Sequence, residues 1–129
     1  MSEPGATARV LVIGLNPYRV PGPWDPKPVA EAIDAGMRKF TEHNVSAESC
    51  LVGLDGQDDP EKMVTAALRA DAWDCVIVGG GIRTSEDQLR LFERVINVVR
   101  VHAPDAAIAF NDTPMDTYEA AARWIGPSR

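Results

Sequence analysis

Short apolar runs alternate along the chain with longer segments in which apolar residues recur every three or four positions. The apolar runs cover residues 9–15, 46–54, 74–78 and 106–110. Continuous apolar runs are typical of strands that are buried on both faces of a parallel sheet. The run at 46–54 mixes polar with apolar residues, so we expect that strand at an edge of the sheet.

The segments with helical spacing are predicted to form four helices, at residues 28–43, 60–70, 85–102 and 115–125. Apolar side chains recur at helical spacing in the first of them, at Val29, Ile33 and Met37. Asp59 followed by Pro60 is a start signal for the second helix. Ser85 with Gln88 three residues later predicts a capping box at the start of the third.

Strictly alternating strands and helices with short connections imply a parallel sheet with right-handed crossovers and helices on both faces. We therefore predict a three-layer α/β/α fold with a four-stranded, mostly parallel sheet in the order 2-1-3-4, of the flavodoxin-like or Rossmann-like kind. The chain shows no internal repeat and no boundary, so residues 1–129 are expected to form a single α/β domain.

Composition narrows the classes of partner. The 129 residues are 45% hydrophobic and 25% charged, which is ordinary for a globular protein. A net charge of -6 leaves no basic face for a nucleic-acid backbone, although a local basic pocket for a small anion stays compatible with it. No apolar stretch has the length of a membrane span and the first residues do not resemble a signal peptide, so we expect a cytoplasmic, bacterial-type protein without membrane association.

Cysteine and histidine give no sign of a metal or other cofactor. Cys50 and Cys75 lie inside apolar runs and are expected to be small buried side chains, joined by a disulfide only if their strands are neighbours. No Cys/His spacing suits zinc. His43 and His102 fall in last turns of predicted helices, where interaction with the helix dipole is the simpler role.

The predicted strand order also predicts where a ligand binds. In open parallel sheets, ligands bind outside the carboxyl ends of the strands, where the strand order reverses. Here that point lies between the first and third strands, where the loops 16–27 and 79–85 meet. The turn 111–114 lies one strand further along the same edge.

The glycine-rich loop is one of two candidate binding segments. Gly79, Gly80 and Gly81 permit a close approach of a ligand to the backbone, and the helix behind them is expected to offer free amides to an anion. Arg83 would add a bidentate contact. The alternative is a tight turn with a solvated Arg83. The expected ligand-binding residues are Asn16, Tyr18, Arg19, Trp24, Gly79, Gly80, Gly81, Arg83, Thr84, Ser85 and Asn111.

The proline-rich loop 16–27 is the other candidate segment, because it is too long for a plain connector. Trp24 would act as an apolar lid over a small molecule, or would simply pack over a helix end. Asn16, Asn111 and Asp112 follow strand ends and would point into the crevice, or would serve as turn residues that bond their own backbone.

Residues 74–104, with Gly81-Ile82-Arg83 and the run 91–99, resemble a group of small uncharacterised bacterial α/β proteins. This resemblance implies a shared fold and no known activity. The segment 12–17 is similar to the first strand and water-positioning loop of mismatch-specific uracil-DNA glycosylases, which would make Asn16 a water-activating residue. The chain departs from that family because it is shorter, is acidic and lacks a second motif with a DNA-inserting loop.

The predicted third helix, 85–102, carries two adjacent apolar stripes, formed by Leu89, Phe92, Ile96 and Val99 and by Leu91, Val95 and Val98. Together they are wider than the stripe of about 100° that a helix needs against one sheet. Either neighbouring helices or a second subunit covers the surplus. We expect a homodimer through this helix.

Two functions fit these features. The first is a dimeric domain that binds a small anionic or polar metabolite without chemistry. The second is a small cofactor-independent enzyme, a hydrolase or lyase, with its site at the carboxyl ends of strands 1, 3 and 4. In it Arg83 would hold an anionic group, Asp112 would be the base and Asn16 would orient substrate or water. The absence of a histidine or cysteine at this edge favours the binding domain.

Overall fold

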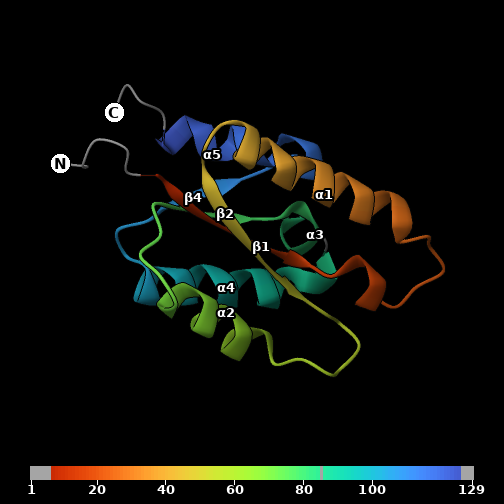
Figure 1. Ribbon diagram of the computed structural model, residues 1–129. Coiled ribbons are helices and arrows are strands. Elements are labelled where there is room, and N and C mark those ends of the chain that lie inside the picture. The colour runs from red at the N-terminus through yellow and green to blue at the C-terminus, as the bar shows by residue number, and fades with distance from the viewer. Residues whose placement is uncertain (1–6, 85, 126–129) are drawn as a thin grey trace.

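The computed structural model describes residues 7–84 and 86–125, and its four strands form one parallel sheet (Figure 1). The strands are β1 (Arg9–Leu15), β2 (Ser46–Val52), β3 (Cys75–Val78) and β4 (Ala107–Phe110). Their order in the sheet is β2-β1-β3-β4, and all three pairings are parallel. The predicted fold class and strand order are therefore confirmed, with the mixed polar and apolar strand at one edge.

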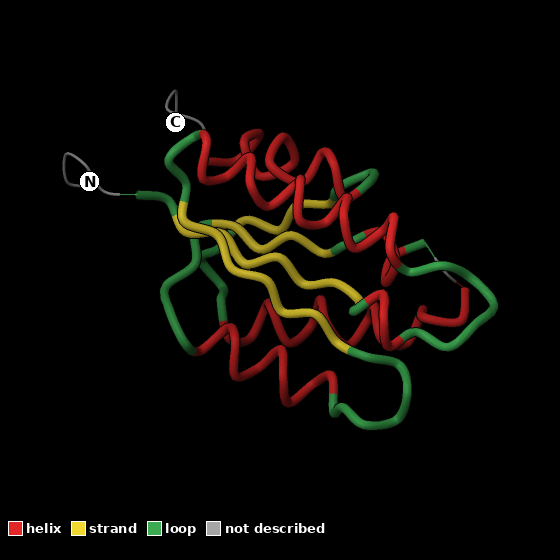
Figure 2. The backbone as a smooth tube through the Cα atoms, turned by 45° about the vertical axis from the view of Figure 1, so that its right-hand side comes forward, coloured by secondary structure: helices red, strands yellow, loops and turns green. Residues whose placement is uncertain are grey.

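The helices cover both faces of this sheet. The described α-helices are α1 (Lys27–Glu42), α2 (Pro60–Arg69), α3 (Gly80–Arg83), α4 (Leu89–His102) and α5 (Thr117–Ile125). Short 3-10 turns stand at η1 (Pro17–Arg19), η2 (Glu86–Gln88) and η3 (Pro114–Asp116). Figure 2 shows the sheet between two helix layers, with α1 and α5 on one face and α2 and α4 on the other. No helix in the described ranges combines the length and the hydropathy that a bilayer crossing requires.

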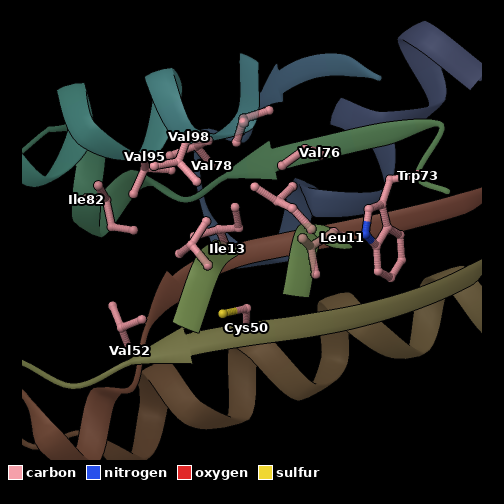
Figure 3. Close-up of a cluster of buried hydrophobic side chains, with 13 residues drawn as sticks. Leu11, Ile13, Cys50, Val52, Trp73, Val76, Val78, Ile82, Val95 and Val98 are labelled. Atoms are coloured by element: carbon pink, nitrogen blue, oxygen red, sulfur yellow. The ribbon is translucent and has the colours of Figure 1, made fainter. Parts of the chain in front are cut away.

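Side chains of β1 alternate between two buried clusters, because successive residues of a strand point to opposite faces. Val10 and Val12 join the cluster under α1 and α5. Leu11 and Ile13 join the cluster under α2 and α4, where Figure 3 shows Val78 beside Val95 and Val98 of α4. The continuous apolar run of β1 therefore reflects burial on both faces.

Helix α4, which corresponds to the third helix predicted from the sequence, begins later than predicted. Its N-cap is Gln88 rather than Ser85, which lies outside the described residues, and Gln88 makes no side-chain capping bond. Residues 80–83 form the separate turn α3, in which the amides of Ile82 and Arg83 both donate to the Gly79 carbonyl at 3.2 Å. The expectation of a long helix whose free amides stand directly behind the glycines is therefore wrong, because the glycines themselves are wound into a helical turn.

Three smaller expectations have clear outcomes. His43 caps the end of α1 and His102 is the last residue of α4, as predicted. Cys50 and Cys75 are both buried, but their strands lie on either side of β1 and are not neighbours. Loop 16–27 is not wholly irregular, because Pro17 begins the turn η1.

The second apolar stripe of α4 is explained within the chain. Val95 and Val98 of this stripe, with Val99 of the first, are buried in one cluster with Val64 and Leu68 of α2. The neighbouring helix therefore covers much of the surplus that the sequence pattern shows. Leu89, at the start of α4, stays 66% exposed.

Helix α1 approaches η3 closely at Gly36, which provides a test of the packing. A Cβ atom at this position would lie 2.1 Å from the carbonyl oxygen of Pro114. We expect Gly36→Ala to lower the free energy of unfolding by about 1–3 kcal/mol, because this overpacking outweighs the roughly 1 kcal/mol gain in helix propensity. Urea denaturation followed by circular dichroism measures the difference.

The matched control is Asp34→Ala, two residues earlier on the exposed side of the same helix. It is expected to change the free energy of unfolding by less than about 0.5 kcal/mol. A Gly36→Ala protein as stable as the wild type would show that α1 and η3 are not packed as described.

Candidate functional site

A cavity of about 390 Å³ lies at the carboxyl ends of β1, β3 and β4. Cavities of this size accommodate small organic ligands. It stands at the reversal of strand order between β1 and β3, where the sequence predicted a ligand site. Its walls come from the ends of β1 and β2, the β1–α1 loop, α1, the glycine turn and the β4–α5 turn. The lining residues are Val12, Ile13, Gly14, Leu15, Pro17, Val20, Trp24, Val29, Ile33, Met37, Leu51, Gly79, Gly80, Gly81, Thr84, Asn111, Asp112, Thr113, Pro114 and Thr117.

The structure brings about half of the expected site residues together. Those that line the cavity are Trp24, Gly79, Gly80, Gly81, Thr84, Asn111 and the expected base Asp112. Asn16, Tyr18, Arg19 and Arg83 are outside the lining. Ser85 is outside the described residues.

Trp24 closes one side of the cavity. Its indole Nε1 donates to the Val20 carbonyl oxygen at 3.2 Å, which folds the loop back on itself. Gly22 has φ = 149°, and a Cβ atom there would stand 3.1 Å from the Trp24 ring. Glycine is therefore required at this turn, because a side chain would be strained and would press on the indole. The loop contributes Pro17, Val20 and Trp24 to the cavity lining, and the role of Trp24 as a lid stays a prediction.

Asn16 and Tyr18 do not reach the cavity. The Asn16 side chain accepts a bond from the backbone amide of Tyr18 at 3.0 Å and so caps η1. The backbone amide of Asn16 donates to the Val52 carbonyl oxygen at 2.8 Å. Asn16 is thus a turn residue, the simpler of its two interpretations, while Tyr18 is mostly exposed.

Arg19 fastens the β1–α1 loop to the β2–α2 loop. Its guanidinium lies 3.0 Å from carboxylate oxygens of both Asp55 and Asp58. The Gly53 amide also donates to Asp58 at 2.8 Å. Hydrogen bonding by Arg19 lowers the pKa of Asp55, and the Gly53 amide, followed by Arg19, lowers the pKa of Asp58. Arg19 therefore anchors the loop that contributes Pro17, Val20 and Trp24 to the cavity lining.

Arg83 is half-buried and lies outside the cavity lining, with an Nε that is buried and has no hydrogen-bond partner among the described residues. Its Nη2 donates to the backbone carbonyl oxygen of Asn111, and its guanidinium carbon lies 5.6 Å from the centroid of the Phe110 ring. This placement differs from both sequence interpretations. The guanidinium joins the glycine turn to the end of β4 from behind the cavity wall.

Asn111 and Thr117 form a buried polar pair in the cavity wall. Their side chains are 5% and 4% exposed. Asn111 Nδ2 donates to Thr117 Oγ1 at 3.0 Å, and that hydroxyl donates to the Pro114 carbonyl oxygen at 2.7 Å. Asn111 Oδ1 has no hydrogen-bond partner among the residues that the structure describes.

The turn after β4 is held by a capping box. The Asp116 carboxylate accepts bonds from the amides of Thr113 at 2.7 Å and Asp112 at 2.9 Å. Burial by itself would raise the pKa of Asp116, but these amides lower it below its usual range. The turn therefore holds Asp112 at the cavity, where it is the only charged residue in the described part of the lining.

The wall formed by α1 was not predicted to belong to the site. Val29, Ile33 and Met37 line the cavity, although their spacing predicted only the apolar side of a helix. A core stripe and a cavity wall have the same helical spacing, so the sequence carries no signal that separates them. Thr117 was missed for a similar reason, because a threonine in a first turn has an ordinary capping role.

The cavity presents a mainly apolar surface with polar groups at one side. Apolar side chains form most of the walls, with an amide and a carboxylate at the β4 side. Among residues 7–84 and 86–125 there is no group of three His, Cys, Asp or Glu side chains able to hold a metal ion. Neither histidine belongs to the cavity lining.

In comparisons with known proteins, no family model, curated protein or solved structure matches this chain.

The ion pairs of Arg19 predict a pH-dependent contribution to stability. The pKa values of Asp55 and Asp58 are lower in the folded protein, so this stabilisation is complete above their unfolded value of about 4 and is lost as the pH falls through the folded values. We expect Arg19→Met to melt at a lower temperature than the wild type at pH 7, with a difference that shrinks below about pH 4. Differential scanning calorimetry between about pH 2.5 and pH 7 measures this difference in melting temperature, because the range spans the titration of both carboxylates.

The control is Arg38→Met, at an exposed position of α1. We expect its melting temperature to stay close to that of the wild type at every pH. A pH-independent difference for Arg19→Met would mean that Arg19 contributes through packing and not through its carboxylate partners.

Proposed function

We propose that this protein binds a small molecule, with an apolar body and a polar head, in the cavity at the carboxyl ends of β1, β3 and β4, without chemistry. The observation that carries the proposal is the cavity itself, about 390 Å³ in volume and lined mainly by apolar side chains. Such a surface binds through removal of apolar area from water, while a few polar groups fix the orientation of the ligand.

Of the anionic and polar ligands expected from the sequence, the polar class has more support. Asp112 is the only charged residue in the described lining, and its charge repels an anion. Arg83, the expected anion ligand, donates instead to the Asn111 backbone. The enzyme alternative has less support, because Asp112 lines the cavity and its expected companions Asn16 and Arg83 do not.

We also propose that the protein is a cytoplasmic homodimer, on the sequence features given above. Leu89 and Phe110 are exposed large apolar side chains, and the Phe92 ring lies 6.1 Å from that of Phe110. These side chains connect the start of α4 with the edge strand β4. They support a contact with a second copy at this side of the molecule.

The first experiment tests the cavity with a neutral probe. We expect 4-phenylbutan-2-one, which has a phenyl ring and a small polar end, to bind with a Kd in about the millimolar range. Ile33→Trp, which fills the cavity from α1, is expected to weaken binding at least about tenfold. Titration followed by ¹H–¹⁵N spectra measures the Kd and shows whether residues of the lining respond.

The matched control is Val101→Trp, which places the same ring at a 59% exposed position of α4 outside the lining. It should bind the ketone as the wild type does. The proposed site would be contradicted if the wild type did not bind the ketone. It would also be contradicted if Ile33→Trp still bound the ketone and the spectral shifts fell on residues outside the lining.

A separate measurement tests association. Sedimentation at micromolar concentration is expected to give the mass of two chains for the wild type and of one chain for Leu89→Arg, because a buried unpaired charge disfavours the interface. Val101→Arg, at another exposed position of α4, serves as the control and should stay dimeric. A monomeric wild type would exclude the homodimer.

A further inference from the structure

We infer that the head of the ligand donates hydrogen bonds from nitrogen, as a carboxamide or an ammonium group does, to Asn111 Oδ1 and to the Asp112 carboxylate. This inference rests on the proposed function and specifies its ligand. It follows from the orientation of one buried amide and from the charge of the cavity lining.

The hydrogen bonds of Thr117 fix the orientation of the Asn111 amide. The hydroxyl of Thr117 has a single hydrogen, which it donates to the Pro114 carbonyl oxygen. Toward Asn111 the hydroxyl can therefore only accept, so the group that faces it must be the Nδ2 donor. The acceptor Oδ1 is consequently the side-chain atom of Asn111 without any partner among the described residues, while Nδ2 keeps a second hydrogen.

That unpartnered oxygen is costly. Asn111 is only 5% exposed, and its Oδ1 has no hydrogen-bond partner among the described residues. A buried acceptor without a hydrogen bond costs about 1–3 kcal/mol. Asn111 belongs to the cavity lining, but its Oδ1 is buried, so a ligand reaches this atom only with a small shift of the wall. A ligand that then donates a hydrogen bond to Oδ1 recovers this cost, whereas a ligand that only accepts does not.

Asp112 adds a second acceptor at the next position of the chain. Two acceptors on adjacent residues, with no cationic side chain in the described lining, match a head that carries two or more N–H groups and no negative charge. A carboxamide and an ammonium group share this chemistry, and the net charge of -6 favours the ammonium form over an anion.

Four probes with one apolar body separate the classes of head. They are 4-phenylbutan-2-one, 3-phenylpropanamide, 3-phenylpropanoate and 3-phenylpropylammonium. The amide differs from the ketone by an NH₂ in place of a methyl, and from the carboxylate by an NH₂ in place of an oxygen. We expect the amide, the ammonium or both to bind about tenfold tighter than the ketone, and the carboxylate to bind more weakly than the ketone.

Two variants assign the preference to residues. Asn111→Leu removes the acceptor at similar volume, and Asp112→Asn removes the charge. Both are expected to bring the affinity for the nitrogen probes to within about threefold of that for the ketone. The controls make the same changes outside the lining, Asn97→Leu on α4 and Asp105→Asn before β4, and should keep the preference.

The outcomes are distinguishable from failure of the proposed function. If all four probes bind alike, or if the carboxylate binds best, the donor head is wrong although the cavity still binds small molecules. A preference that survives in Asn111→Leu removes Asn111 from the inference, as expected if a water joins Oδ1 to the nearby Arg83 side chain. If no probe binds, the proposed function fails first. If Asn111→Leu does not fold, the comparison of the four probes on the wild type and on Asp112→Asn still tests the preference for a nitrogen donor.

Discussion

The central position of β1 is the constraint on which the rest of the structure depends. β1 pairs in parallel with β2 along seven positions from Arg9 to Leu15, and with β3 along four from Val10 to Ile13. Both of its faces are buried, so helices must cover both sides of the sheet. Parallel pairing also brings the carboxyl ends of the strands to one edge. The chain leaves β1 and β3 toward different layers there, and the cavity lies between the two departures.

Ion pairs and hydrogen bonds of residues outside the lining hold the loops around the cavity in place. Arg19 joins the β1–α1 loop to the β2–α2 loop through two carboxylates. Arg83 joins the glycine turn to the backbone of Asn111, and Asp116 caps the turn that follows it. Arg19, Arg83 and Asp116 are themselves outside the lining, which is mainly apolar and carries one charged side chain, Asp112.

Asn111 and the neighbouring Asp112 give this mainly apolar site much of its polar character. A buried amide with one satisfied donor is tolerated when its remaining acceptor is used by a partner. In a core that never meets a ligand, an aliphatic side chain at this position would avoid the cost of burying the amide. The pairing with Thr117 holds the amide in one orientation, and a fixed acceptor distinguishes ligands by what they donate.

The sequence by itself determined the strands, the strand order and the edge of the sheet at which the cavity lies. These features follow from local patterns, because burial on both faces removes polar residues from β1 and β3, and short connections restrict the topology. The presence of Trp24 in the cavity lining also agrees with the sequence, because the long proline-rich loop that carries it follows β1 at that edge.

Only the tertiary structure decided which side chains face the cavity. Arg19 and Arg83 stand in the predicted loops, yet their partners are Asp55, Asp58 and the Asn111 backbone, and these lie 28 or more positions away in the sequence. Ile33 has the spacing of a core residue and lines the cavity instead. Local sequence patterns record whether a side chain is apolar or charged. Whether it meets a neighbour or an open space depends on contacts between distant segments, and those exist only once the chain has folded.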